Sequence, residues 1–345
     1  MNIIDLEKEY QKLAPSAAQF GFELSRQLAE LLNQHGVSLG FPIQQRVKAW
    51  ASIADKIERK SLDPKSISHI SDLIGIRIIV LFQRDANSVC ELIKENFKVL
   101  QQENAQDRLG TGEFGYSSVH FHIELKPDWL AIPTLKTLLN LKAEIQVRTM
   151  AQHIWAASSH ILQYKKENGV PPPVRRSIYR VSALLETVDL EFERVLASRD
   201  EYVTLVDTSS SSEELNVDLV AKILNENLPA ENTDGQEPYD ELLEDLVHFS
   251  ISTPRELVQL LKKHSGEIIE ADKIIASEQD PLFLQNHQTD RIRRARGVFF
   301  NHVGLVRQAM SLEFGAKWVE YFPIIVERNL EKRKSKAKAA NSELS

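Results

Sequence analysis

The strongest constraint on the fold is the run IGIRIIVLF at 74–82, which is almost continuously apolar and rich in β-branched residues. Such a run is typical of a central strand in a sheet that other elements cover. Arg77 lies inside this run, and a guanidinium in an apolar strand is costly unless an anion neutralises it. The position of Arg77 therefore indicates either an internal carboxylate partner or a bound phosphate.

A second strand is predicted in the segment AEIQVRTM, because side chains alternate between the two faces of an extended chain. One face then carries Glu144, Gln146 and Arg148, and the other carries Ile145 and Val147. An acid and a guanidinium on one face can present a carboxylate to a metal ion and a cation to a phosphate. This segment points more directly at a chemistry than any other part of the chain.

The remaining patterns predict an α+β domain, in which a mixed β-sheet is flanked by helices. Helical spacing of apolar residues is expected at 1–40, 43–60, 85–97, 133–140 and 151–166. Further strands are expected at 99–106 and 117–125, the second of which alternates apolar and polar residues.

The C-terminal half predicts a separate all-α module. The sequence GVPPP is a strong helix breaker, and the polar stretch DTSSSSEE cannot bury enough surface to fold alone. We therefore expect an N-terminal helical segment (1–39), the α+β domain (40–166), a helical extension (167–206), a linker (207–214), a helical module (215–328) and a disordered tail (329–345).

Composition argues for a cytoplasmic protein. The net charge of −7 disfavours non-specific binding of nucleic acid by the whole chain. The single cysteine, Cys90, cannot form an internal disulfide, as expected in a reducing compartment. The N-terminus does not resemble a signal peptide, and no apolar stretch approaches the roughly 20 residues of a membrane span.

A cationic helix face is predicted from Lys48, Ser52 and Lys56, which are spaced at i, i+4 and i+8. Arg46 lies just ahead of them, and such a cluster can hold a polyphosphate. By itself the pattern is more typical of a solvated helix face than of a phosphate site. Asp72, just before the apolar run, can serve either as a site carboxylate or as a cap between helix and strand.

The loop GEFGYSSVH combines glycines, which allow close backbone approach, with an aromatic ring at Tyr116 that can stack on a base. Tyr116, Ser118, His120 and His122 share one face of the following strand. Two histidines at i and i+2 without a third ligand nearby make a zinc site improbable.

Taken in chain order, these motifs resemble the synthetase domain of the RelA/SpoT alarmone family, over about 40–166. The resemblance rests on RVKAWASIADK, DLIGIRIIV, GYSSVH, EIQVRT and HIWAASSHILQYK. It implies a stand-alone (p)ppGpp synthetase with a nucleotidyltransferase-like fold and a helical C-terminal extension. Such an enzyme transfers the β,γ-pyrophosphate of ATP to the 3′-hydroxyl of GDP or GTP. The resemblance also leaves homo-oligomerisation open.

The resemblance implies a role for each matched residue. Asp72 and Glu144 match the two carboxylates of a Mg²⁺ site, and Glu144 also assists deprotonation of the acceptor hydroxyl. Arg46, Lys48 and Lys56 match positions that bind the phosphates of ATP. The patterns described above add Ser52 and Arg77 to this set of predicted phosphate ligands. The residues that match positions around the acceptor nucleotide are Tyr116, Ser118, His120, Gln146 and Arg148. The resemblance implies that the acceptor base stacks on Tyr116.

The sequence departs from the family pattern at three positions, and two alternative functions stay open. Phe114 replaces a common asparagine, and Ala157 and Ser159 stand where many members carry acids. The first alternative is an enzyme of the same fold that uses a tRNA 3′ end or an adenosine nucleotide as acceptor. The second is a non-catalytic nucleotide sensor, which the retention of Asp72 and Glu144 argues against. The chain contains no His-Asp dipeptide, so we expect no hydrolase activity.

Overall fold

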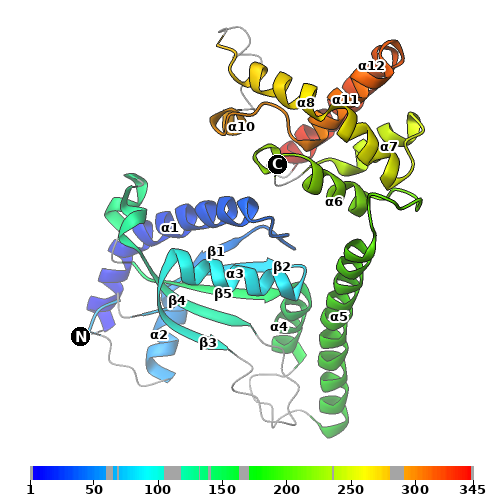
Figure 1. Cartoon of the computed structure of the whole chain (residues 1–345). Helices are drawn as coiled ribbons and strands as arrows, with labels where there is room; N and C mark the ends of the chain where they lie inside the picture. The colour runs from blue at the N-terminus through cyan, green and yellow to red at the C-terminus, as the bar shows by residue number, and fades with distance from the viewer. Residues whose placement is uncertain are drawn as a thin grey trace. The chain divides into compact units, whose positions relative to one another are not determined.

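A computed structural model describes residues 3–59, 65–67, 70–104, 118–131, 133–138, 141–162, 171–234, 237–279 and 291–342 (Figure 1). The chain forms two compact units, Met1–Ser198 and Arg199–Ser345. The division falls inside a long helix, ahead of the polar segment predicted as a linker. Tyr116 and Phe114 lie outside the described residues.

The first unit is built on a mixed sheet, as the sequence predicts, but the sheet has five strands instead of the four that the sequence patterns indicate. The strands are β1 (Gln44–Val47), β2 (Ile74–Val80), β3 (Phe97–Asn104), β4 (Val119–Leu125) and β5 (Ala143–Thr149). Their order across the sheet is β1-β2-β5-β4-β3. The central strands β2 and β5 are parallel, and every other neighbouring pair is antiparallel.

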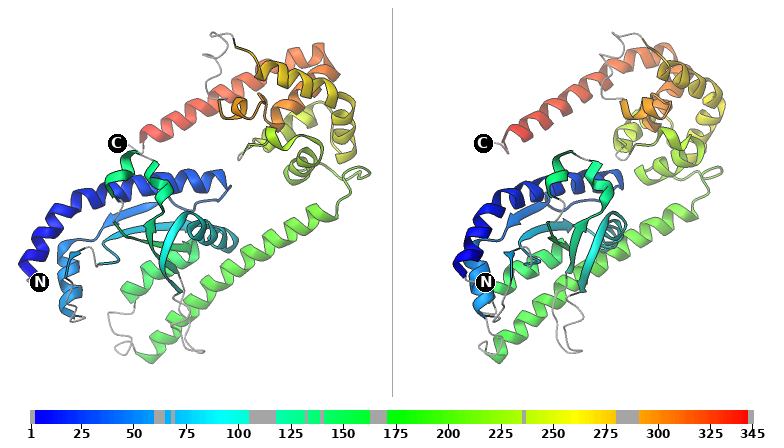
Figure 2. Two further views of the ribbon diagram at one scale, coloured as in Figure 1. Left: turned by 60° about the vertical axis from the view of Figure 1, so that its left-hand side comes forward. Right: turned by 90° about the vertical axis from the view of Figure 1, so that its left-hand side faces the viewer.

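Helices flank this sheet on both sides. They are α1 (Ile3–Gln34), α2 (Trp50–Arg59), α3 (Gln83–Asn96), α4 (Met150–Leu162) and α5 (Pro172–Leu205), with 3₁₀ turns at Pro127–Ala131 and Pro133–Leu138. Helices α1 and α3 share one apolar core with the strands, in which Phe20, Ile76 and Ile145 are fully buried. Figure 2 shows α1 and α4 on opposite sides of the sheet. The apolar core therefore lies on the α1 side, which leaves polar side chains to the other face.

One predicted helix is wrong in its first part. The segment 43–60 was expected to be helical throughout, but Gln44–Val47 form the edge strand β1, and α2 begins only at Trp50. Pairing with β2 satisfies the backbone of this segment and overrides its local helical pattern. Lys48 consequently precedes the helix and does not share a helix face with Lys56.

The second unit is entirely helical over its described residues. It contains α6 (Val217–Asn227), the 3₁₀ turn Ala230–Asn232, α7 (Tyr239–His248), α8 (Pro254–Ala276), α10 (Arg291–Ala295), α11 (His302–Phe314) and α12 (Ala316–Ser342). Its core includes Leu219, Leu242 and Met310. Asp245, which is fully buried, accepts hydrogen bonds from Arg307 and Arg328 at 2.7 Å each. This ion-pair network joins α7 to α11 and α12.

Two predictions for the second unit differ from the structure. The polar stretch 207–214 is an ordered turn, because the Asp207 carboxylate accepts hydrogen bonds from the hydroxyls of Ser209 and Ser210 at 2.7 Å. The tail expected to be disordered is helical as far as Ser342, which agrees with the high helix propensity of its alanines and lysines. Among the helices described here, none is long and apolar enough to cross a membrane.

Candidate active site

The polar face of the sheet gathers the predicted site residues from three neighbouring strands. Gln146 on β5 lies opposite Arg77 on β2 and opposite His120 on β4, while Glu144 lies opposite His122. Directly opposed residues place their side chains on the same face of a sheet. The alternation predicted for β5 is confirmed, because its apolar side chains are buried on the other face.

Asp72 forms the first part of the site, with two lysines. Lys48 Nζ and Lys56 Nζ both donate to Asp72 Oδ2, at 2.6 and 2.8 Å. A backbone hydrogen bond from Lys48 to Leu73 (2.8 Å) holds Lys48 beside the carboxylate. Burial raises the pKa of Asp72, but the hydrogen bonds and charges of the two lysines outweigh it, so the pKa lies below its usual range. Asp72 is therefore ionised at neutral pH.

Glu144 forms the second part, in a short chain of hydrogen bonds. Nδ1 of His120 donates to Glu144 Oε1 at 2.7 Å, and Ser118 Oγ lies 2.7 Å from Nε2 of the same ring. Burial raises the pKa of Glu144, and the charge of Asp72 acts in the same direction. The hydrogen bond from His120 and the charges of His120 and His122 outweigh both and lower the pKa overall. The two carboxylates are thus close enough to influence each other electrostatically.

Three arginines form the third part. Burial and the charges of Arg77 and Arg46 lower the pKa of Arg148 to about 10, and burial and Arg46 also lower the pKa of Arg77. The Nε atoms of Arg77 and Arg148 are buried and have no hydrogen-bond partner in the described part of the chain. Arg77 donates to the amide of Gln44 (2.9 Å) and makes no ion pair with any described carboxylate. This cation cluster is better suited to an anionic ligand than to an internal acid.

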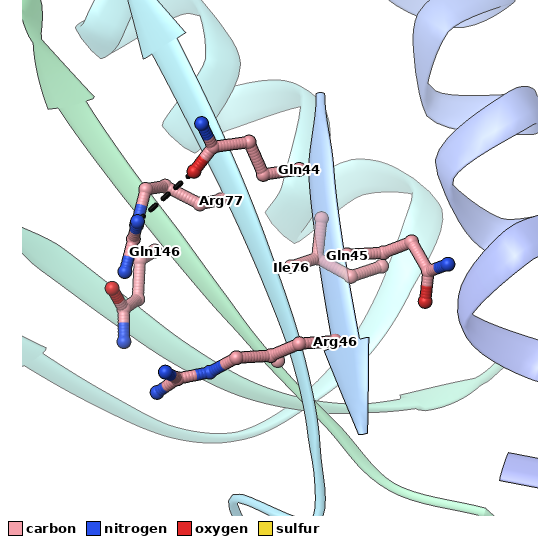
Figure 3. A pocket seen from close by; sticks show the side chains of 7 residues that line it. Gln44, Gln45, Arg46, Ile76, Arg77 and Gln146 are labelled. Atoms are coloured by element: carbon pink, nitrogen blue, oxygen red, sulfur yellow. Dashed lines mark hydrogen bonds between the residues drawn. The ribbon is translucent and has the colours of Figure 1, made fainter. Parts of the chain in front are cut away.

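A pocket of about 140 Å³ opens beside two of these arginines, Arg46 and Arg77. Figure 3 shows Arg46, Arg77 and Gln146 extending toward the same side of the sheet, with Gln44 bonded to Arg77. The lining residues are Gln44, Gln45, Arg46, Gly75, Ile76, Arg77 and Gln146. An arginine-lined pocket of this kind suits a planar or anionic group of a nucleotide.

The residues present can hold a divalent metal. Asp72 Oδ1 is buried and lacks a hydrogen-bond partner among the described residues, because both lysines bind the other oxygen. Within the described ranges, no group of three or more His, Cys, Asp and Glu side chains is arranged to bind a metal. Mg²⁺ typically takes one or two carboxylates and completes its shell with phosphates and water, and Asp72 Oδ1 is an oxygen that such an ion could use.

The sequence patterns missed two residues beside the site, His153 and Gln44, and they included one residue, Ser52, that the structure leaves exposed. His153 on α4 lies close enough to the arginines that burial, Arg148 and Arg77 lower its pKa, and its Nδ1 is buried without a described partner. The only sequence signal for it was its position in the motif HIWAASSHILQYK. Gln44 carried no signal because its segment was expected to be helical. Ser52 is exposed on α2.

Replacing Arg148 provides a test of the arginine cluster. The lowered pKa means that folding disfavours the charged form, a cost that is fully present below about pH 10 and fades as pH rises through the usual guanidinium range. We expect Arg148→Gln to raise the ligand-free Tm by about 2–4 °C, which corresponds to about 1 kcal/mol. The same variant should lose most of the Tm increase that GDP gives the wild type, because Arg148 is predicted to bind the acceptor nucleotide.

Differential scanning fluorimetry with and without GDP measures both effects. Arg26→Gln is the matched control, because the Arg26 side chain is 58% exposed on α1 and pairs with Glu23 (3.3 Å). A lower ligand-free Tm combined with an unchanged GDP response would contradict the cluster as an anion site.

Comparison with known proteins identifies the family. The family model described as "Region found in RelA / SpoT proteins" matches residues 45–169. The chain is 32% identical over 154 residues to the GTP pyrophosphokinase YjbM of Bacillus subtilis, covering 44% of this chain and 69% of that protein. It is 29% identical over 197 residues to the GTP pyrophosphokinase YwaC of the same organism, covering 55% and 87%.

A solved structure shows a weaker likeness. The small alarmone synthetase 1 of Bacillus subtilis matches with 26% identity and a TM-score of 0.46, covering 56% of this chain and 99% of that one. On the sequence comparisons, the chain belongs to the RelA/SpoT family, as its motifs predicted. The predicted enzyme class, a pyrophosphokinase, is the class of both named relatives.

Proposed function

We propose that the chain transfers the β,γ-pyrophosphate of ATP to the 3′-hydroxyl of GDP or GTP, which yields AMP and (p)ppGpp. The observation that carries this proposal is the arrangement of two ionised carboxylates, Asp72 just ahead of β2 and Glu144 on β5, which influence each other and the nearby arginines electrostatically. Transfer of a phosphoryl-type group depends mainly on positioning and charge neutralisation, which such a face supplies without a covalent nucleophile.

In this proposal the two carboxylates have different tasks. Glu144 accepts the proton of the attacking hydroxyl, and the hydrogen bond from His120 fixes the direction of its carboxylate. Asp72 Oδ1 and Glu144 would hold Mg²⁺, which when bound neutralises charge on the phosphate oxygens. Lys48 and Lys56 stay near the phosphates because Asp72 holds both ammonium groups.

The remaining side chains divide between the two nucleotides. Arg46 and Arg77, which line the pocket, bind ATP together with the two lysines. Ser118, His120, Gln146 and Arg148 face the acceptor, and Arg148 is oriented by its hydrogen bond to Gln146 (2.9 Å). Ser52 remains a proposed phosphate ligand. It could contact ATP only if the phosphates extend to the exposed face of α2.

The alternative acceptors are less well supported. A tRNA substrate calls for a basic surface, whereas the chain carries a net charge of −7. A non-catalytic sensor has no need for two carboxylates, and Ala157, where many relatives carry an acid, is an exposed position on α4. We also propose that the chain does not hydrolyse (p)ppGpp, since its sequence contains no His-Asp dipeptide.

Substitution of Tyr116 tests the proposed binding of a guanosine nucleotide as acceptor. Stacking of a nucleobase on an aromatic ring is worth about 1–3 kcal/mol, so Tyr116→Ala should raise the KM for GDP or GTP by roughly tenfold or more. The KM for ATP should change little, and Tyr116→Phe should be mild because the ring face makes the contact. Steady-state kinetics with each substrate varied in turn provides the measurement.

The opposite pattern would reverse the two nucleotide sites. If Tyr116→Ala weakens ATP and leaves the acceptor unchanged, the tyrosine belongs to the donor site. An acceptor panel of GDP, GTP, ATP and bulk tRNA with γ-labelled ATP identifies the substrate class directly. Label that appears in tRNA or in an adenosine nucleotide, and not in a guanosine nucleotide, would replace the proposed acceptor.

A further inference from the structure

Two arginines of the site are each held by a neutral amide. Nη1 of Arg77 donates a hydrogen bond to Oε1 of Gln44 at 2.9 Å, which Figure 3 shows. Nη2 of Arg148 donates to Oε1 of Gln146 at the same distance of 2.9 Å. Neither arginine forms an ion pair with a carboxylate in the described part of the chain. The residues that orient these two guanidinium groups are therefore uncharged.

The second unit holds two of its arginines in the opposite way. Arg307 and Arg328 both bind the buried carboxylate of Asp245 at 2.7 Å. A carboxylate neutralises a guanidinium, whereas an amide oxygen accepts its hydrogen bond and leaves the positive charge uncancelled. Arg307 and Arg328 thus serve the packing of their own unit, while the two arginines of the sheet keep their charge for a ligand.

The edge strand β1 places Gln44 beside Arg77. The two residues lie directly opposite each other in the antiparallel pair of β1 and β2, so their side chains share one face of the sheet. Because a guanidinium has only donors, the amide of Gln44 must turn its oxygen toward Arg77. Among the described residues, no other side chain accepts a hydrogen bond from Arg77, and its Nε is buried without a partner. The direction of this guanidinium therefore depends on Gln44.

We propose that Gln44 is a positioning residue, which directs Arg77 toward ATP and leaves the positive charge of Arg77 free to act on that ligand. This inference rests on the function proposed above, in which Arg77 binds ATP. It assigns a role to a residue that the proposed mechanism does not otherwise use, and it explains why the acceptor opposite Arg77 is an amide and not an acid.

A carboxylate at position 44 would remove this advantage. Burial and the charge of Arg46 together outweigh the charge of Glu144 and lower the pKa of Arg77, so its charged form gains from an anion within reach. Gln44→Glu supplies such an anion from within the chain, and ATP must then displace it. Gln44→Met has a similar length but no strong acceptor, so it removes the orienting hydrogen bond without adding a charge. The two variants separate orientation from neutralisation.

Isothermal titration calorimetry of the full chain with ATP and Mg²⁺, in the absence of an acceptor, measures both variants. We expect Gln44→Met to weaken ATP binding by about twofold to tenfold, the usual range for one hydrogen bond. Gln44→Glu should weaken it by about 10–100-fold, because a hydrogen bond between charged groups is stronger. The affinity for GDP and the ligand-free Tm should change little, since Gln44 is exposed at the edge of the sheet. A residue that only stabilised the fold would not produce this split.

Gln102→Glu is the matched control. Gln102 is an exposed glutamine on β3, at the opposite edge of the same sheet, so its replacement adds the same charge away from Arg77 and should leave ATP binding unchanged. Wild-type affinity in Gln44→Glu, or an equal loss in both Gln44 variants, would overturn the proposal. A wild type that binds ATP but forms no (p)ppGpp would instead refute the proposed function, because the binding assay requires no transfer.

Discussion

Glu144→Gln is expected to lower pyrophosphate transfer by about 10²–10⁴-fold, the usual contribution of a positioned general base. Glutamine keeps the size of the side chain but cannot take a proton from the acceptor hydroxyl. It also lacks the negative charge that the His120 hydrogen bond stabilises at 2.7 Å. The loss should fall on kcat, since the interaction develops in the transition state, while KM for both nucleotides changes little.

The control for this variant is Glu124→Gln. Glu124 lies near the end of the neighbouring strand β4, beyond His122, where it pairs with Lys98 (2.9 Å) and with no residue of the site. Its replacement should leave turnover within about twofold of the wild type, as for most surface substitutions. Near-normal turnover by a correctly folded Glu144→Gln protein would remove the proposed mechanism.

Asp72→Asn is expected to have the second-largest effect, a loss of about 10²-fold or more in kcat/KM, by analogy with charged groups removed from a transition-state site. The amide gives up the charge that holds Lys48 and Lys56 together, so the two ammonium groups repel each other. It also weakens the oxygen proposed to bind Mg²⁺. We therefore expect the Mg²⁺ concentration for half-maximal activity to rise, a shift that a purely structural role for Asp72 would not cause.

Combining the two substitutions tests whether the carboxylates act as a unit. Residues that serve one step give strongly non-additive losses, so the double variant should be little worse than Glu144→Gln alone. Losses that multiply, together with an unchanged Mg²⁺ requirement in Asp72→Asn, would indicate independent roles for the two residues.

The two central strands could be predicted from sequence because their signals are local. The β-branched run of β2 and the alternation of β5 each fix which side chains are buried, whatever surrounds them. The face shared by Glu144, Gln146 and Arg148 follows directly from the two-residue period. Which residues of β2 and β4 lie beside these three side chains depends on the register of strand pairing, and the sequence patterns do not specify that register.

The remaining features depend on long-range contacts. Gln44–Val47 form a strand because β2 offers an edge with which they can pair. The local sequence does not reveal this pairing, so the pattern of Lys48 and Lys56 was interpreted as one face of a helix. The two lysines still meet, but at Asp72, which is 24 and 16 residues away in the chain. His153 likewise acquires its lowered pKa from arginines on other elements, which a single-sequence pattern does not reveal.

The most direct test of the proposed function is the identity of the nucleotide products. Purified protein incubated with ATP, GDP and Mg²⁺ should form AMP and ppGpp in equal amounts, as measured by ion-exchange chromatography with mass spectrometry. Equal formation of AMP shows that two phosphates leave ATP as one group. Formation of ADP in place of AMP, or consumption of ATP without a pyrophosphorylated guanosine nucleotide, would contradict the proposal.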